Sequence, residues 1–120
     1  MTGIVFHATE QRHEIVEFYL DVFDAVVRLE QPDCTILGYD GFLFGFCERD
    51  HTDDCGTLTF VFPDRAGVDA AYDRLGDAAV DEPRENATYD IYQCFGVDPD
   101  GRTVECQTFL DAEDRRAIGE

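Results

Sequence analysis

The sequence predicts an α+β fold built from two β-α-β-β-β modules, and three observations lead to this prediction. The same order of strand-like and helix-like segments occurs twice, in residues 3–47 and in residues 57–109. The apolar positions of the two helical segments coincide when one is moved by 53 residues. A turn sequence near the end of each module also coincides. Because self-similarity of this kind is typical of a duplicated architecture, the two halves are expected to fold alike.

The repeat can be followed at individual positions. The coinciding helical positions pair Arg12 with Arg65, Ile15 with Val68, and Tyr19 with Tyr72. In the second half of each module, the turn Gly38-Tyr39-Asp40-Gly41 lies over Asp98-Pro99-Asp100-Gly101. This alignment places Gly45 opposite Glu105 on the last strand of each module. Agreement at both ends of the modules makes a chance repeat of element order a weaker explanation.

The first module begins with an apolar, β-leaning segment, Gly3–Thr9, which predicts a strand. Residues 11–23 then carry apolar side chains at helical spacing with charges opposite, which predicts an amphipathic helix lying on a sheet. The strands expected after this helix are Ala25–Glu30, Asp33–Gly38 and Phe42–Cys47. The phenylalanines Phe42, Phe44 and Phe46, with Phe60 and Phe62 of the second module, are expected to pack under the helices.

A polar, Gly-terminated segment, residues 48–56, is interpreted as the linker between the modules. The second module is expected to consist of a strand at 57–62, a helix at 64–75 with Asp64 as its N-cap, short strands at 78–81 and 89–95, and a last strand up to residue 109. Asp98-Pro99-Asp100-Gly101 is typical of a type I turn. Residues 1–110 are expected to form one domain, and residues 111–120 a frayed polar tail.

The charge balance is strongly acidic, with 27 acidic residues against nine basic ones, all of them Arg. A net charge of −18 repels phosphate backbones and anionic lipid surfaces, so neither nucleic acid nor a membrane is expected as a partner. Such self-repulsion is tolerable where salt shortens the Debye length to about 3 Å at 1 M. We therefore expect a halophilic environment. Neither a secretory signal nor a membrane span is visible, which predicts a cytoplasmic protein.

The five cysteines are Cys34, Cys47, Cys55, Cys94 and Cys106. Their odd number and the absence of a C-x-x-C pair argue against both a disulfide framework and a cysteine-rich zinc site. Cys34 and Cys47 are expected to be buried structural residues, since the sequence supplies no dependable base beside either.

The duplicated element order, a helix containing Glu-Phe-Tyr, and Asp-Pro-Asp-Gly-Arg before a strand bearing Glu105 resemble the vicinal oxygen chelate superfamily. This superfamily includes glyoxalase I, extradiol dioxygenases, fosfomycin-resistance enzymes and bleomycin-binding proteins. The resemblance covers roughly residues 3–110. It implies that each module curls a mixed four-stranded sheet into a half-barrel around a cavity, and that two chains form a homodimer. It also implies that metal-dependent members place ligands on the first and last strands of each module.

A metal site is therefore tested position by position. Ile4 and Thr57 stand where first-strand ligands are expected, and Gly45 and Glu105 where last-strand ligands are expected. Among these four, Glu105 alone can bind a divalent cation strongly, and one carboxylate does not make a site. His7 is the further candidate. If the first strand follows the alignment without a shift, His7 faces the helix as a buried structural histidine. A one-residue slip or a bulge in this strand would turn His7 toward the cavity beside Glu105.

The cavity face follows from strand alternation. Leu43, Gly45 and Cys47 share one face of their strand, Thr57, Thr59 and Val61 share one face of theirs, and Gln107 extends the face of Glu105. For the penultimate strand, the set Tyr89, Ile91 and Gln93 and the alternate set Asp90, Tyr92 and Cys94 both remain open. Glu105 is interpreted as a cavity carboxylate and possible proton acceptor; its alternative is a structural ion pair or hydrogen bond.

Three functions remain at this point. The first is a protein that binds a small organic molecule and has a degraded metal site. For this function the sequence identifies no definite cofactor. The second is a metal-dependent enzyme, either a glyoxalase-like lyase or isomerase or an extradiol-type dioxygenase, which uses Glu105 and His7 with a divalent metal ion. The third is a structural or regulatory dimerisation module. The missing ligands at Ile4, Gly45 and Thr57 favour the first.

Overall fold

The computed structural model describes residues 2–119 and divides into two compact units. The first unit contains the described residues up to Cys55 together with the turn Asp98–Arg102, and the second contains Gly56–Val97 together with the described residues from Thr103 onward. Each unit holds one four-stranded mixed sheet with a helix packed on it. Within residues 2–119, no helix has the length and apolar character needed to cross a bilayer.

The first unit consists of β1 (Ile4–Thr9), α1 (Arg12–Phe23), β2 (Val26–Glu30), β3 (Cys34–Tyr39) and β4 (Phe42–Glu48). The sheet order is β1-β4-β3-β2, in which β1 runs parallel to β4 and the other pairs are antiparallel. A register shift between Val27 and Leu29 interrupts the pairing of the edge strand β2. The parallel pair places Phe6 beside Gly45 and His7 beside Phe46.

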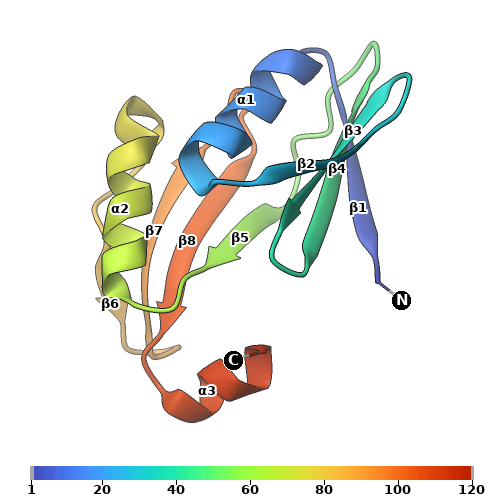
Figure 1. Ribbon diagram of the computed structural model, residues 1–120. Helices are drawn as coiled ribbons and strands as arrows, with labels where there is room; N and C mark the ends of the chain where they lie inside the picture. The colour runs from blue at the N-terminus through green and yellow to red at the C-terminus, as the bar shows by residue number, and fades with distance from the viewer. Residues whose placement is uncertain (1, 120) are drawn as a thin grey trace. The chain divides into compact units, whose positions relative to one another are not determined.

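The core of the first unit lies between α1 and the middle strands β3 and β4 (Figure 1). Tyr19, at the centre of the buried face of α1, stacks on Phe46 and meets Phe44 edge to face, with ring centroids 5.4 and 5.3 Å apart. All three side chains have no exposed surface. Offset and edge-to-face contacts of this kind add stability beyond the burial of apolar area. The 3.6-residue period of α1 and the two-residue period of β4 thus meet in one aromatic cluster.

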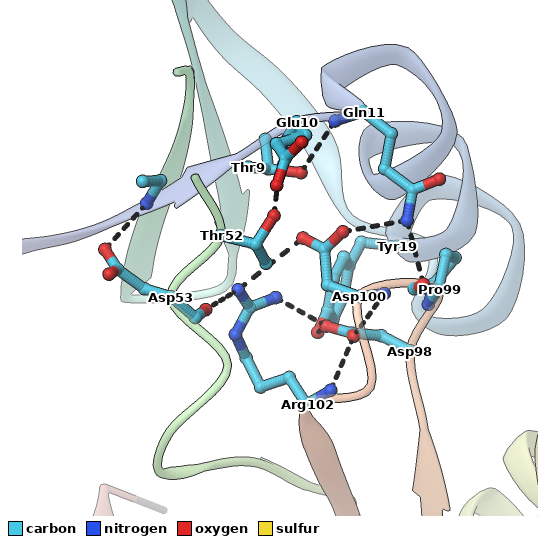
Figure 2. Close-up of polar contacts among 11 residues, drawn as sticks. Thr9, Glu10, Gln11, Tyr19, Thr52, Asp53, Asp98, Pro99, Asp100 and Arg102 are labelled. Carbon is cyan, nitrogen blue, oxygen red and sulfur yellow. Dashed lines mark hydrogen bonds and ion pairs between the residues drawn. The ribbon is translucent and has the colours of Figure 1, made fainter. Parts of the chain in front are cut away.

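The turn Asp98–Arg102 completes this core with a buried ion pair (Figure 2). Arg102 is fully buried, and its guanidinium donates to Asp98 Oδ2 at 2.7 Å and to the backbone carbonyl of Asp53, above the ring of Phe46. The other Asp98 oxygen, Oδ1, accepts from the backbone N–H groups of Asp100 and Arg102. The Tyr19 hydroxyl donates to Asp98 at 2.6 Å. The turn is therefore held by its own backbone and by the helix beside it.

The second unit consists of β5 (Thr57–Val61), α2 (Arg65–Leu75), a short 3₁₀ turn η1 (Gly76–Ala78), β6 (Arg84–Asn86), β7 (Ile91–Val97), β8 (Thr103–Phe109) and α3 (Ala112–Ile118). Its sheet order is β5-β8-β7-β6, with β5 parallel to β8. This order repeats that of the first unit, so the α+β prediction with two β-α-β-β-β modules is confirmed.

Helix α2 packs on β7 and β8 in the second unit (Figure 1). The predicted N-cap is confirmed, because Asp64 Oδ1 accepts a hydrogen bond from the Gly67 backbone N–H at 2.9 Å. Val104 and Cys106 of β8 and Cys94 of β7 are buried on the sheet face that α2 covers. Strand alternation then directs Thr103, Glu105, Gln107 and Phe109 to the opposite face.

Two expected elements of the second unit are wrong. The strand expected at 78–81 is replaced by the end of η1 and one isolated bridge, Ala79 to Gly96. The edge strand is instead β6, whose three polar residues lie between the strands expected at 78–81 and 89–95. The expected frayed tail is also wrong, because Asp111 caps α3 by accepting from the backbone N–H groups of Glu113 and Asp114. In both places short polar segments lack the apolar period on which the prediction depends.

The expectation that the chain has no disulfide is also wrong. Cys34 and Cys47 are direct cross-strand neighbours in β3 and β4 and form a disulfide. Residues opposite each other in an antiparallel pair bring their Cβ atoms within bonding reach, however far apart they are in sequence. The spacing rule, which searches for C-x-x-C, does not detect such a pair. Cys55 is an exposed free thiol, and Cys94 and Cys106 are buried free thiols.

Candidate functional site

Glu105, in the middle of β8, is the centre of a hydrogen-bonded cluster on the sheet face away from α2. Its Oε1 accepts from the Thr59 hydroxyl on the neighbouring strand β5 at 2.8 Å. Its Oε2 accepts from the side-chain amide of Gln107 at 2.8 Å and from that of Gln93 on β7. Thr59 is the direct register partner of Glu105, and Gln93 is that of Gln107. The backbone pairing thus brings four polar side chains from three strands together.

The orientation of the Gln93 amide is fixed by a chain of hydrogen bonds that starts at the backbone. The N–H of Thr88 donates to Asn86 Oδ1 at 3.1 Å, so the Asn86 nitrogen points the other way. That nitrogen donates to Gln93 Oε1 at 2.8 Å, which leaves the Gln93 nitrogen to face Glu105. Every group in contact with the carboxylate therefore donates to it. An ionised carboxylate, which is acceptor-only, matches such surroundings.

The cluster forms the polar part of a hollow of about 510 Å³ within the second unit, called here the Glu105 hollow. Its apolar walls are Tyr89, Ile91, Phe95 and Phe109. Its polar lining is Asn86, Gln93, Glu105 and Gln107. Glu105 is half-buried, and Gln107 is buried at 9% exposure. A mostly apolar concavity with a few convergent polar groups is the usual form of a small-molecule site.

The structure decides between the two sets of residues left open for the penultimate strand. Tyr89, Ile91 and Gln93 line the Glu105 hollow. Tyr92 instead donates its hydroxyl to Asp69 of α2 at 2.6 Å, and this hydrogen bond raises the pKa of Tyr92 to about 12. Cys94 lies buried opposite Cys106, beneath the same helix. The strand begins at Ile91, so Tyr89 reaches the hollow from the turn that precedes β7.

The remaining candidate wall residues are distributed over both units. Thr59 contacts Glu105, while Thr57 lies at the exposed start of β5 in register with Thr103. Leu43 lies in the first unit, half-buried in β4 beside Ile4 of β1. Cys47, predicted as a ligand contact, is bonded to Cys34 and has no free thiol.

His7 lies on the helix side of β1. Its ring stacks on Phe46 at a centroid distance of 5.9 Å, and its Nε2 is buried with no hydrogen-bond partner among the described residues. Burial, and then the positive charge of Arg102, lower the pKa of His7 below its usual value. The acidic side chains Asp53, Asp98 and Asp100 oppose this shift without reversing it. His7 is therefore half-buried against the aromatic core of the first unit, where its ring binds a proton less readily than a free imidazole does.

Known structures share this fold. A glyoxalase/bleomycin resistance protein/dioxygenase family enzyme from Burkholderia phytofirmans PsJN matches with a TM-score of 0.77 and 18% identity, over 89% of this chain and 97% of that chain. The fosfomycin resistance protein FosX from Listeria monocytogenes matches with a TM-score of 0.77 and 13% identity, over 96% and 97%. The chain has the glyoxalase/bleomycin resistance/dioxygenase fold.

A lactoylglutathione lyase from Agrobacterium tumefaciens shares the fold as well, with a TM-score of 0.72 and 18% identity over 90% of this chain and 92% of that chain. No protein-family model and no curated protein matches the sequence. The resemblance to the vicinal oxygen chelate superfamily is thus confirmed as a likeness of fold. At these identities the likeness says nothing about substrate.

The resemblance implies metal ligands on the first and last strands of each module, so the donor set around Glu105 is compared with what a metal ion requires. Within residues 2–119, no group of three or more His, Cys, Asp or Glu side chains is arranged to hold one. The neighbours of Glu105 present amide nitrogens and a hydroxyl to it, and the Asn86 chain fixes the Gln93 nitrogen toward the carboxylate. Amide nitrogens are not ligands for divalent cations, which take oxygens, imidazoles or thiolates. The donor set does not fit a metal.

Sequence reasoning missed three members of the hollow. Phe95 and Phe109 follow from the alternation that identified Gln93 and Gln107, since each lies two residues further along the same strand face. That signal was present and could have been used. Asn86 carried no such signal, because the edge strand Arg84–Asn86 has three residues and is too short to show a period.

Proposed function

We propose that the protein binds a small organic molecule in the Glu105 hollow and does so without a metal ion. The observation that carries this proposal is the carboxylate of Glu105, held by Thr59, Gln93 and Gln107 beside apolar walls. Three neutral donors orient the carboxylate, which remains partly exposed to a ligand in the hollow. Binding sites commonly combine one oriented polar group, which gives specificity, with apolar walls, which supply most of the affinity.

Within this proposal the metal site of the superfamily is degraded. Thr57 and Gly45 occupy positions where the resemblance implies ligands; a threonine hydroxyl does not bind a divalent cation strongly, and glycine has no side chain to offer. Glu105 is the remaining carboxylate, and its oxygens are engaged by amides and a hydroxyl. The role left to Glu105 is to accept a hydrogen bond or offset a charge on the ligand.

The test is a thermal-shift screen of small organic molecules against the purified protein, with dissociation constants measured for the hits. Glu105→Gln and Phe109→Ala are expected to weaken each genuine ligand. Asp77→Asn, which removes one exposed charge from η1 of the same unit, is the matched control and is expected to leave affinity unchanged. Elemental analysis accompanies the screen. Stoichiometric divalent metal that is lost on Glu105→Gln contradicts the proposal and favours the metal-dependent lyase, isomerase or dioxygenase.

We also propose that the protein is a homodimer. Both edge strands of the first unit carry exposed apolar side chains, with Phe6 of β1 47% exposed and Val26 and Leu29 of β2 55% and 52% exposed. Exposed apolar groups gathered on strand edges are typical of surfaces that pair with another chain. Light scattering after size exclusion at about 1 M salt, where charge repulsion is screened, measures the mass. A monomer at all accessible concentrations contradicts this proposal.

The acidic composition supports a further proposal, that the protein works in a salt-rich cytoplasm. Repulsion among the 27 acidic residues decreases as salt shortens the Debye length, so the free energy of unfolding is expected to rise steeply with salt. The Cys34–Cys47 disulfide bears on the compartment, because disulfides are rare where thiols are kept reduced. Stability that is independent of salt contradicts the halophilic assignment, whereas the redox state of this pair in cells reports on the compartment.

A further inference from the structure

The Glu105 hollow contains a negative charge that no side chain in its lining offsets. Of the residues that line it, Glu105 is charged and the others are amides, aromatics and one aliphatic side chain. The sequence has no Lys, and among the described residues no Arg or His lines the hollow. The three groups that contact the carboxylate are neutral donors. A half-buried carboxylate without a counter-charge is costly, and a cation that reaches it is correspondingly favoured.

Two guanidinium groups of the second unit, those of Arg84 on β6 and Arg65 on α2, have acidic partners of their own. Arg84 lines a neighbouring hollow and donates to Asp81. Arg65 donates to Glu85 and lies 4.8 Å from the ring centroid of Tyr92. Both arginine side chains are exposed, and neither lines the Glu105 hollow. With no basic side chain among the described residues of its lining, the Glu105 hollow is suited to a ligand that brings a positive charge.

The hydrogen bonds around Glu105 leave room for one more donor. A carboxylate offers about four acceptor positions, two on each oxygen. Oε2 already accepts from both Gln93 and Gln107, whereas Oε1 accepts from Thr59 alone. One position on Oε1 remains for an N–H group that enters the hollow. Phe95, Phe109 and Tyr89 line the walls, and aromatic side chains pack against an apolar body and attract a cation that lies over a ring face.

We infer that the ligand of the Glu105 hollow is an organic cation, an ammonium group carried on an aromatic or aliphatic body small enough for about 510 Å³. The ammonium N–H donates to Glu105 Oε1 and the body packs between the aromatic walls. This inference rests on the proposed binding function and specifies its ligand class. Carboxylates and phosphonates are repelled by Glu105 and by the net charge of −18, so anionic ligands are disfavoured at this hollow.

Three probes with the same phenylethyl body separate charge from shape: phenethylammonium, 2-phenylethanol and phenylacetate. Binding is followed in NMR spectra of the isotope-labelled protein through the side-chain amide signals of Gln93 and Gln107, which report on the hollow directly. Phenethylammonium is expected to bind about tenfold more tightly than 2-phenylethanol, since it adds a partly exposed ion pair and a cation–π contact. Phenylacetate is expected to leave both amide signals unmoved. All titrations are run at one high ionic strength, because an acidic protein attracts any cation weakly.

Two variants distinguish the site from the general charge of the protein. Glu105→Gln keeps the shape of the hollow and removes its charge, so the ammonium and the alcohol are expected to bind within about twofold of each other. Asp77→Asn removes the same charge from the surface of the same unit and is expected to retain the full tenfold preference. The fold of each variant is checked by the dispersion of its backbone amide spectrum.

The possible results separate the two proposals. A preference for phenylacetate or 2-phenylethanol at Gln93 and Gln107 overturns the cation inference and leaves the binding function intact. A preference for the ammonium that survives in Glu105→Gln, or disappears in Asp77→Asn, also overturns it, because general electrostatics then explains the binding. If none of the probes moves the two amide signals, the inference fails and the binding function must be judged on the library screen.

Discussion

The two modules share one backbone register and differ in the side chains they place on the sheet face away from the helix. In the second module, Thr59 of β5 pairs with Glu105 of β8 and donates a hydrogen bond to it. In the first module, Phe6 of β1 pairs with Gly45 of β4. A Cβ atom added at Gly45 would lie 2.6 Å from the ring of Phe6. The aromatic ring thus occupies the space that a side chain at residue 45 would need.

The flanking positions differ in the same way. Gln93 and Gln107, which are register partners in the second module, donate to Glu105. The equivalent partners in the first module are Cys34 and Cys47, which are joined as a disulfide. One module therefore carries a carboxylate with polar donors, and the other carries a ring over a glycine beside a covalent cross-link. The two modules keep the same strand pairing. The chemistry of this sheet face differs because four residues differ: Thr59, Gln93, Glu105 and Gln107 in the second module, and Phe6, Cys34, Gly45 and Cys47 in the first.

The turns between the last two strands also diverge. In the first module, Asp40 adopts a positive φ of 48° in an exposed turn. In the second, the longer turn Asp98–Arg102 buries a charged pair, and both side chains have no exposed surface. The first turn closes a hairpin, whereas the second also supplies the polar centre of the first unit (Figure 2). This difference predicts that the two turns respond very unequally to mutation.

The largest effect is expected for Arg102→Met. The change leaves Asp98 buried without its cation and removes the donor to the carbonyl of Asp53. Breaking a buried ion pair from one side costs about 3–5 kcal/mol of the free energy of unfolding. Chemical denaturation at fixed high salt measures the change. Arg116→Met, at an exposed position of α3, is the matched control and is expected to stay within about 0.5 kcal/mol of the parent. Equal effects of the two substitutions contradict the assigned role of the turn.

A somewhat smaller effect is expected on reducing the Cys34–Cys47 disulfide. Its ends are 13 residues apart, and closing a loop of about 15 residues contributes roughly 3 kcal/mol in the chain-entropy account. Denaturation with and without a reductant measures this contribution. The Cys34→Ser, Cys47→Ser double variant is the control, because its stability should not respond to the reductant.

Thiol counting tests the same assignment independently. In the folded, oxidised protein Cys55 is expected to react quickly with a thiol reagent, while Cys94 and Cys106 react after unfolding. Cys34 and Cys47 react after reduction. If five thiols are titrated in the unfolded, unreduced protein, the disulfide does not form in solution, and the contrast with the glutamine pair of the second module is lost.

An intermediate effect is expected at Gly45, where the two sheet faces differ most. Gly45→Ala forces the half-exposed ring of Phe6 to turn and places the added methyl group 3.3 Å from the carbonyl oxygen of Thr35, so it is expected to cost about 0.5–1.5 kcal/mol, as a displaced rotamer does. In a Phe6→Ala background the contact is absent, so the same substitution is expected to cost less than about 0.5 kcal/mol. The double-mutant cycle, measured by denaturation, gives the coupling between the two positions. A coupling near zero shows that Phe6 does not occupy the place of a side chain at residue 45.

The sequence allowed much of this to be predicted, for reasons that can be traced to particular residues. Period and repetition identified α1, α2 and seven of the strands within a residue or two, because burial of one face determines register. The alternation that placed Thr59 and Gln107 beside Glu105 is a local property of strands. Where a prediction depended on a long apolar pattern or a repeated turn, it was accurate.

The predictions that failed concern short polar elements and contacts between residues that are distant in the sequence. β6 and α3 are short and polar, so neither shows a periodic apolar pattern in the sequence. The N-terminus of α3 is capped by Asp111. The disulfide depends on which residues face each other across β3 and β4, which spacing in the sequence does not reveal. The direction of the Gln93 amide follows from a chain through Asn86 to a backbone N–H, and such a network exists only in three dimensions.

The smallest effect concerns His7, whose equivalent in the second module is Phe60, fully buried under the helix side of its sheet. Burial and then Arg102 lower the pKa of His7, so the folded protein binds its proton less readily than the unfolded chain does. The stability that neutral His7 contributes is therefore complete above its ordinary pKa of 6.5 and is lost as the pH falls toward the lowered value. His7→Phe, which copies the second module, removes this dependence.

Denaturation between about pH 7.5 and 5.5 should show the parent losing stability relative to His7→Phe as the pH falls. Because the carboxylates titrate alike in both proteins, the difference between the two curves isolates residue 7. Parallel curves would mean that the ring is protonated as readily in the folded protein as in the unfolded chain. The first module would then place a charged histidine against Phe46 where the second module has the apolar Phe60. The two modules would differ in their cores as well as on the sheet faces away from the helices.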